Sequence, residues 1–168
     1  MQYAMTGFLL AITTGTVFGQ QMRVAGTVPK HTFLRVAATP REVQVANESI
    51  GAVNLHVRTA DGVSVIPLIA RSNTAYRLTA QGSEGVELRV TAVKPFAGTE
   101  HLMAGAATVL VTGPVALAHF PQTILEGPRI SNSGNDSTVD NALLIHVEVN
   151  GRQTDAVVTL SMVPAATQ

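Results

Sequence analysis

Apolar and polar residues alternate with a period of two along most of the chain. In AVNLHVRT (52–59) every second residue is apolar. In VELRVTA (86–92) the same pattern places Val86, Leu88 and Val90 on one face. Such alternation predicts strands that turn one face to a core and the other to solvent. No segment after residue 20 shows a convincing helical period, and a short candidate at 98–107 contains two glycines that weaken it.

Turn residues separate the alternating segments at roughly ten-residue spacing. Ala60-Asp61-Gly62 and Gly113-Pro114 are two such signals. Asn150-Gly151 favours a type I′ turn and predicts a terminal hairpin between 142–149 and 156–163. Pro67 predicts an edge strand or a bulge, because proline cannot donate to a ladder.

Eight to ten short strands with turns between them predict an all-β fold, an antiparallel β-sandwich, with a barrel as the alternative. The alternating segments in which these strands are expected occupy 33–37, 43–45, 52–59, 63–69, 75–80, 86–92, 107–112, 115–120, 124–130, 142–149 and 156–163.

The 168 residues are enough for one domain with a core. Lys plus Arg and Asp plus Glu both number 11, so there is no basic excess to hold a nucleic-acid backbone. Cysteine is absent, which excludes disulfides, a thiol nucleophile and thiolate metal ligands. Composition therefore points away from nucleic acid and from cysteine chemistry.

Residues 1–19 predict an export signal, because Ala4–Phe18 is apolar and uncharged and Gly19 suits a cut before Gln20. The segment lacks the usual positive charge at its start, and it is too short and too rich in Thr and Gly to favour a permanent membrane span. We expect residues 20–168 to form a single domain in the periplasm, at the cell surface or outside the cell.

The mature chain would begin with QQMRVAGTVP (20–29). Met22, Val24, Gly26 and Val28 fall on alternate positions, as in a strand with one apolar face. This strand is either the first of the chain's own sheet or a strand that is added to another molecule, and the alternation alone does not choose between them.

Candidates for catalysis and metal binding are few. His146 and Glu148 share one face of an expected strand, and such a pair can orient a base. No motif ties a nucleophile to them, so we expect exposed polar positions and no enzyme. None of the five histidines has a metal-ligand spacing, and no cofactor is expected.

The loop SNSGNDSTVDN (131–141) is rich in the oxygen ligands that calcium prefers, although its spacing is not that of a known calcium loop. It is either a weak calcium candidate or a plain turn-rich loop. Asn47-Glu48-Ser49 and Asn135-Asp136-Ser137 fit the N-glycosylation tripeptide, which occurs often by chance.

The alternating Met22, Val24, Gly26 and Val28, together with the alternating end of the chain at 156–163, resemble bacterial chaperone–usher pilin subunits. The resemblance implies an immunoglobulin-like sandwich that lacks one strand. It also implies like subunits and a periplasmic chaperone as partners, and assembly of a pilus or fimbria by donation of the N-terminal strand. Many such pilins carry a disulfide, which this chain cannot form.

Two alternatives remain open beside pilus-like assembly. The first is a self-contained exported binding module for a protein or glycan partner, which would use loops such as 81–85 and 131–141. The second is a hydrolase that uses His146 and Glu148.

Overall fold

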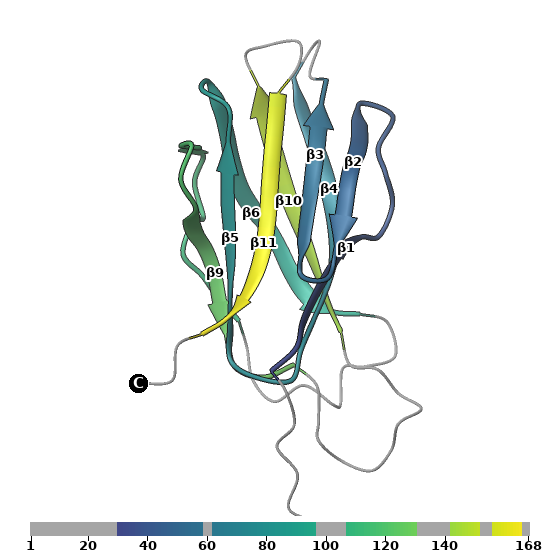
Figure 1. Cartoon of the computed structure of the whole chain (residues 1–168). Coiled ribbons are helices and arrows are strands. Elements are labelled where there is room, and N and C mark those ends of the chain that lie inside the picture. Colours follow the sequence, from purple (N-terminus) through teal and green to yellow (C-terminus); the bar gives the residue numbers. More distant parts are fainter. Residues whose placement is uncertain (1–29, 59–61, 97–106, 131–141, 152–155, 166–168) are drawn as a thin grey trace, which may run out of the picture.

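The computed structural model describes residues 30–58, 62–96, 107–130, 142–151 and 156–165. In these residues the chain forms two antiparallel β-sheets that pack face to face (Figure 1). No helix long and apolar enough to cross a membrane occurs among them. The expected export segment, the residues Met22, Val24, Gly26 and Val28, nearly all of the helix candidate, and the 131–141 loop lie outside the described ranges.

Sheet A contains five described strands, and each neighbouring pair of strands in it is antiparallel. In spatial order they are β1 (Thr32–Val36), β4 (Val63–Ser72), β10 (Leu143–Gly151), β6 (Val86–Pro95) and β8 (Val115–Ala116).

Sheet B contains six antiparallel strands. In spatial order they are β2 (Val43–Ser49), β3 (Ala52–Val57), β11 (Ala156–Pro164), β5 (Tyr76–Gly82), β9 (Gln122–Gly127) and β7 (Thr108–Val109).

The expected all-β, antiparallel β-sandwich is confirmed. The path of the chain adds detail to that class. Consecutive strands from β3 to β6 alternate between the sheets, and so do β9 to β11. The order β3-β11-β5-β9 therefore faces β4-β10-β6-β8, which is the double Greek key of a jelly roll. In an immunoglobulin constant-type domain the two sheets instead contain strands ABED and CFG.

The predicted terminal hairpin is wrong. β10 lies in sheet A between β4 and β6, whereas β11 lies in sheet B between β3 and β5. Asn150 and Gly151 belong to β10, where Gly151 is paired with Val86. Both strands bury every second residue, and either pairing satisfies that pattern, so the hydrophobic alternation could not distinguish a hairpin from a crossing between sheets.

Pro67 lies at a local edge of sheet A, at the point where the pairing of β4 with β1 ends. β4 is an interior strand of sheet A, but its neighbour β1 ends at Val36, which is paired with Leu68. The Pro67 carbonyl accepts a hydrogen bond from the Ala37 N–H at 2.8 Å, on the side of β1. The proline thus stands where the ladder to β1 stops, and the N–H that it lacks would face this edge.

The core fills the space between the two inner faces. Val53, Leu55 and Val57 of β3 are fully buried, as the alternation predicted, and β6 buries its alternate residues in the same way. Burying each such side chain contributes on the order of 2 kcal/mol relative to leaving it in water. The polar alternates point outward from each sheet. We call the outer surface of sheet A face A and that of sheet B face B.

Candidate functional site

Face B carries a small depression near the end of β5. Its volume is about 230 Å³. It lies over the neighbouring strands β11 and β5 and against the segment that joins β8 to β9. The residues that line it are Gln81, Gly82, Ser83, His119, Val157 and Thr159.

The segment after β8 forms one wall of this depression. It crosses from sheet A to sheet B, since β8 and β9 belong to different sheets. Leu117 N–H donates to the Val86 carbonyl at 2.7 Å, and Gly82 N–H donates to the Ala118 carbonyl at 3.0 Å. These two bonds fasten the crossing beside the end of β5, so that His119 borders the depression.

Gly82 permits this close approach. A Cβ atom at Gly82 would lie 2.8 Å from Leu117 Cδ1 and 3.1 Å from the Val157 carbonyl oxygen. A larger residue would therefore push the crossing segment away from β5 or displace β11. Glycine in a strand often marks such a close approach.

Ser83 continues the ladder between β5 and β11 beyond Gly82. Its N–H donates to the Val157 carbonyl at 3.0 Å, and its Oγ accepts from the Val157 N–H at 2.9 Å. The hydroxyl replaces a backbone carbonyl at this point. Ser83 is therefore occupied in holding Val157, whose side chain is 43% exposed and gives the depression an apolar surface.

Asn54, Thr159 and Gln81 form a row across the neighbouring strands β3, β11 and β5. Thr159 is the direct cross-strand partner of both Asn54 and Gln81. All three side chains are half-buried, and no hydrogen bond from their side chains to another described residue is found. We call these three residues the polar row. Its amide and hydroxyl groups remain available to a ligand, and each can both donate and accept.

The electrostatics of the depression are neutral in character, because none of its six lining residues is Asp, Glu, Lys or Arg. The nearest described ion pair of β5 joins Arg77 Nε to Glu126 Oε2 at 3.7 Å, at the opposite end of the strand. A ligand in this depression would be recognised by hydrogen bonds and apolar contact, since no fixed charge faces it.

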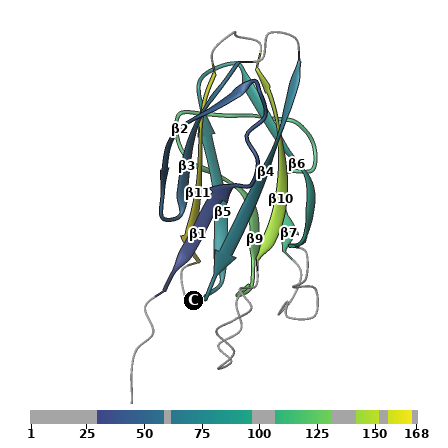
Figure 2. The ribbon, with the colours of Figure 1, turned by 90° about the vertical axis from the view of Figure 1, so that its right-hand side faces the viewer.

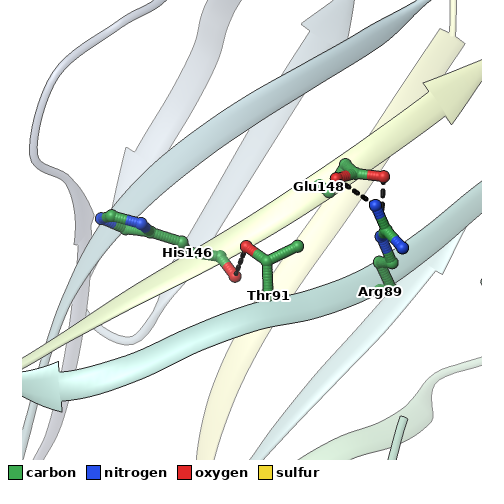
Figure 3. A network of polar contacts seen from close by, with 4 residues as sticks. All are labelled: Arg89, Thr91, His146 and Glu148. Carbon is green, nitrogen blue, oxygen red and sulfur yellow. Dashed lines mark hydrogen bonds and ion pairs between the residues drawn. The ribbon is translucent and has the colours of Figure 1, made fainter. Parts of the chain in front are cut away.

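On face A, Glu148 does not orient His146 as a base. Arg89, the cross-strand partner of Glu148, holds its carboxylate at two points: Nε lies 2.7 Å from Oε1, and Nη2 donates to Oε2 at 2.8 Å (Figure 3). This hydrogen bond and the negative charge of Glu148 raise the pKa of the Arg89 guanidinium above its ordinary value.

The imidazole of His146 points away from Glu148 (Figure 3), and the backbone carbonyl of His146 accepts from Thr91 Oγ1 at 3.2 Å. The carboxylate that was to orient a base is thus engaged by an arginine.

Metal binding finds no support in the described part of the chain, which contains no cluster of three or more His, Cys, Asp or Glu side chains. The proposed calcium loop 131–141 lies outside it, as does Asn135. Asn47 is exposed on β2, so its tripeptide is accessible.

Sequence reasoning located only part of this site. Loop 81–85 was a predicted binding loop, and Gln81, Gly82 and Ser83 do line the depression. His119, Val157 and Thr159 were missed as site residues. The alternation of 156–163 separates Thr159 from Val158 and Leu160, but nothing in the sequence indicated that β11 would lie beside β5.

No known family model and no curated protein matches the chain. Two solved structures are similar to it. One is the N-terminal cellulose-binding domain from Cellulomonas fimi β-1,4-glucanase C, with 14% identity, a TM-score of 0.39, and coverage of 83% of this chain and 90% of that chain. The other is TmCBM61 in complex with β-1,4-galactotriose, with 16% identity, a TM-score of 0.35, and coverage of 79% and 88%. At such scores neither likeness bears on function.

Proposed function

We propose that the protein is an exported, non-catalytic binding module that holds a neutral, hydroxyl-rich ligand, a glycan, on face B. The observation that carries the proposal is the polar row Asn54, Thr159 and Gln81, which leads into a depression without charged residues. Binding of a ligand on such a face requires side chains that hold hydrogen-bonding groups in a fixed geometry. The strands of a sheet hold them in that way.

The chemistry of a sugar matches this surface. Sugar hydroxyls donate and accept, as do the amides and the hydroxyl of the polar row. The apolar face of a sugar ring can rest on Val157, which is exposed within the depression. A volume of about 230 Å³ is below the range of roughly 300–1,000 Å³ that is usual for enclosed ligand sites. The ligand therefore places one unit in the depression and extends over the polar row.

Absence of catalysis remains a prediction of the proposal. It is supported by the position of Glu148, whose carboxylate is held by Arg89 and does not face His146. Replacing His146 with Ala should leave face B and its ligand unaffected, since His146 lies on sheet A.

The test is a binding titration of the chain from Gln20 onward with a panel of soluble neutral and anionic polysaccharides, by affinity electrophoresis and then by calorimetry. Gln81→Ala and Thr159→Val each remove a hydrogen-bonding group from the row, and each should weaken binding of a neutral glycan about tenfold. Thr91→Val on face A is the matched control and should bind as the parent does. If no neutral glycan binds, or if Thr91→Val weakens binding equally, the proposal fails.

Pilus-like assembly through Met22, Val24, Gly26 and Val28 remains a second candidate, favoured by the alternation of those residues. All eleven described strands lie within residues 32–164, and these four residues lie outside the described ranges. Deleting residues 20–28 should abolish assembly under this candidate. If the deleted chain associates as the parent does, strand donation is excluded.

A further inference from the structure

The upper part of β4 is an edge of sheet A that no other described strand pairs with. β4 runs from Val63 to Ser72, but β1 is paired only with Leu68–Ser72. Figure 2, which faces this side of the molecule, shows β4 continuing past the end of β1. Among the described strands, residues 63–66 thus have a paired neighbour on one side only, the strand β10. The unpaired stretch of β4 ends at Pro67, whose carbonyl accepts a hydrogen bond from the Ala37 N–H.

The backbone of this stretch has groups that face outward. Ala37 and Asn73 bond across to the carbonyls of Pro67 and His31, so the odd-numbered residues of β4 direct their N–H and C=O groups toward β1. In an antiparallel ladder these directions alternate, and the even-numbered residues serve β10. Val63 and Val65 therefore direct N–H and C=O groups to the free edge, where no described residue bonds them.

The side chains of the edge do not prevent pairing. Val63 and Val65 are 54% and 44% exposed, and Gly62 to Ile69 includes no charged residue. Proteins commonly blunt free edges with charges, bulges or short strands. Here β2 has a bulge between Val45 and Asn47, and β7 and β8 have two residues each.

β1 is blunted by another means. Thr32 Oγ1 donates to the Met162 carbonyl of sheet B at 2.7 Å, and Leu34 is completely buried. β1 is thus packed against sheet B at Thr32 and Leu34, whereas Val63 and Val65 of β4 are exposed.

We propose that this free stretch of β4 pairs with the same stretch of a second copy of the chain. Antiparallel pairing centred on Ser64 places Val63 opposite Val65 of the second copy, and Val65 opposite its Val63. Both residues direct their backbone groups outward, so each pair can exchange both of its N–H···O=C bonds. The segment is thus complementary to itself, as a twofold contact requires. The zero net charge of the chain adds no repulsion between copies.

This pairing has a consequence for face B. The twofold axis of an antiparallel pair stands perpendicular to the sheet, so both copies turn face B to the same side. Two depressions on one side would let a polymeric ligand engage both copies, and the second contact would then be intramolecular.

Sedimentation equilibrium of the chain from Gln20 onward tests the proposal. The strip is much shorter than a standard interface, so we expect a reversible dimer at concentrations on the order of 0.1–1 mM. Val65→Pro removes an N–H that no described residue bonds, and should weaken dimerisation at least ~tenfold while the melting temperature stays close to the parent's. Val65→Thr keeps the N–H and the branched side chain, and should dimerise as the parent does.

Val63→Lys is a second variant in case the proline disturbs folding, and it should also weaken the dimer. A parent that remains monomeric at about 1 mM overturns the proposal. So does a dimer that persists in both Val65→Pro and Val63→Lys. Loss of association on deletion of residues 20–28, with both edge variants unaffected, would identify the N-terminal segment as the contact and likewise overturn it.

Discussion

The two outer faces of this sandwich are built from similar strands but use their polar residues differently. On face A, Arg89 and Glu148 bind each other, and Thr91 donates to the backbone of His146 (Figure 3). On face B, the row of Asn54, Thr159 and Gln81 has no side-chain hydrogen bond to another described residue. Around Arg89 the polar groups of face A bond to one another, whereas the polar row of face B leaves its side-chain groups to solvent or to a ligand.

The difference shows that outward polar residues on a strand do not by themselves indicate a site. The alternation placed His146 and Glu148 on a common face, and the structure places Gln81 and Thr159 on a common face as well. Their roles depend on what lies on the adjacent strand. Beside Glu148 lies an arginine, whereas beside Thr159 lie two neutral amides and the wall formed by His119.

Thr159→Arg should produce the largest effect on this comparison. A long cationic side chain at this position would fill the depression and remove its neutral character. We expect glycan binding to weaken at least ~100-fold, or about 2.7 kcal/mol, with little change in the melting temperature. Calorimetry with the best neutral glycan measures the first and thermal unfolding the second. Unchanged affinity would mean that the ligand binds elsewhere.

Gly82→Val should have the next largest effect, because its side chain would meet Leu117 and the Val157 carbonyl. Displacing the crossing segment should lower the free energy of unfolding by about 1–2 kcal/mol and weaken binding about tenfold. Gly113→Val is the control, since a Cβ at Gly113 meets no atom within 4 Å. Equal effects of both substitutions would contradict the role assigned to Gly82.

Tyr76, in the core between the two sheets, gives rise to a prediction that concerns stability and leaves binding unchanged. Tyr76 is buried at 1% exposure, its hydroxyl has no hydrogen-bond partner in the described structure, and burial raises the pKa of that hydroxyl well above its ordinary value of 10.0. The unfolded chain therefore releases this proton at lower pH than the folded chain does. Stability is fully present below about pH 10 and falls above it, by up to about 1.4 kcal/mol per pH unit.

Tyr76→Phe should flatten this fall without altering binding on face B. Urea unfolding of parent and variant between about pH 8 and pH 11 checks it. Parallel curves for the two proteins would show that Tyr76 does not carry the dependence.

Glu148→Gln should produce the smallest effect, a slight loss of thermal stability that shrinks in high salt, because the ion pair with Arg89 is partly exposed. Glycan binding should be unchanged. Glu126→Gln, which breaks the looser pair with Arg77, is the matched control on sheet B and should cost less still. Melting temperatures at low and at 1 M salt distinguish the two.

Much of the fold could be predicted from the alternation. Val53, Leu55 and Val57 were placed inward and are fully buried, and the same holds closely for Val86 and Leu88. The strands expected at 107–112 and 115–120 shrink to two residues each in the structure, β7 and β8, and join opposite sheets. The residues before and after β8 connect one sheet to the other. A period-two pattern of apolar residues does not distinguish such a connecting segment from a strand.

The candidate site was less predictable, because it is assembled from three distant segments. Gln81 and Gly82 belong to β5, Thr159 to β11, and His119 to the crossing after β8. Only the turn composition of 81–85 pointed to one of them. The N-terminal segment from which the pilin resemblance came lies outside the described residues, so its role stays a prediction.

The sequence by itself determined the class of the protein and which residues face the core, because burial of alternate side chains is a local property of each strand. Only the tertiary structure decided which strands are neighbours. The same alternation suits a hairpin of β10 with β11 and their separation into two sheets, and the structure has the second. That decision places Thr159 between Asn54 and Gln81, and Glu148 beside Arg89, since cross-strand pairs form only after every strand has its place.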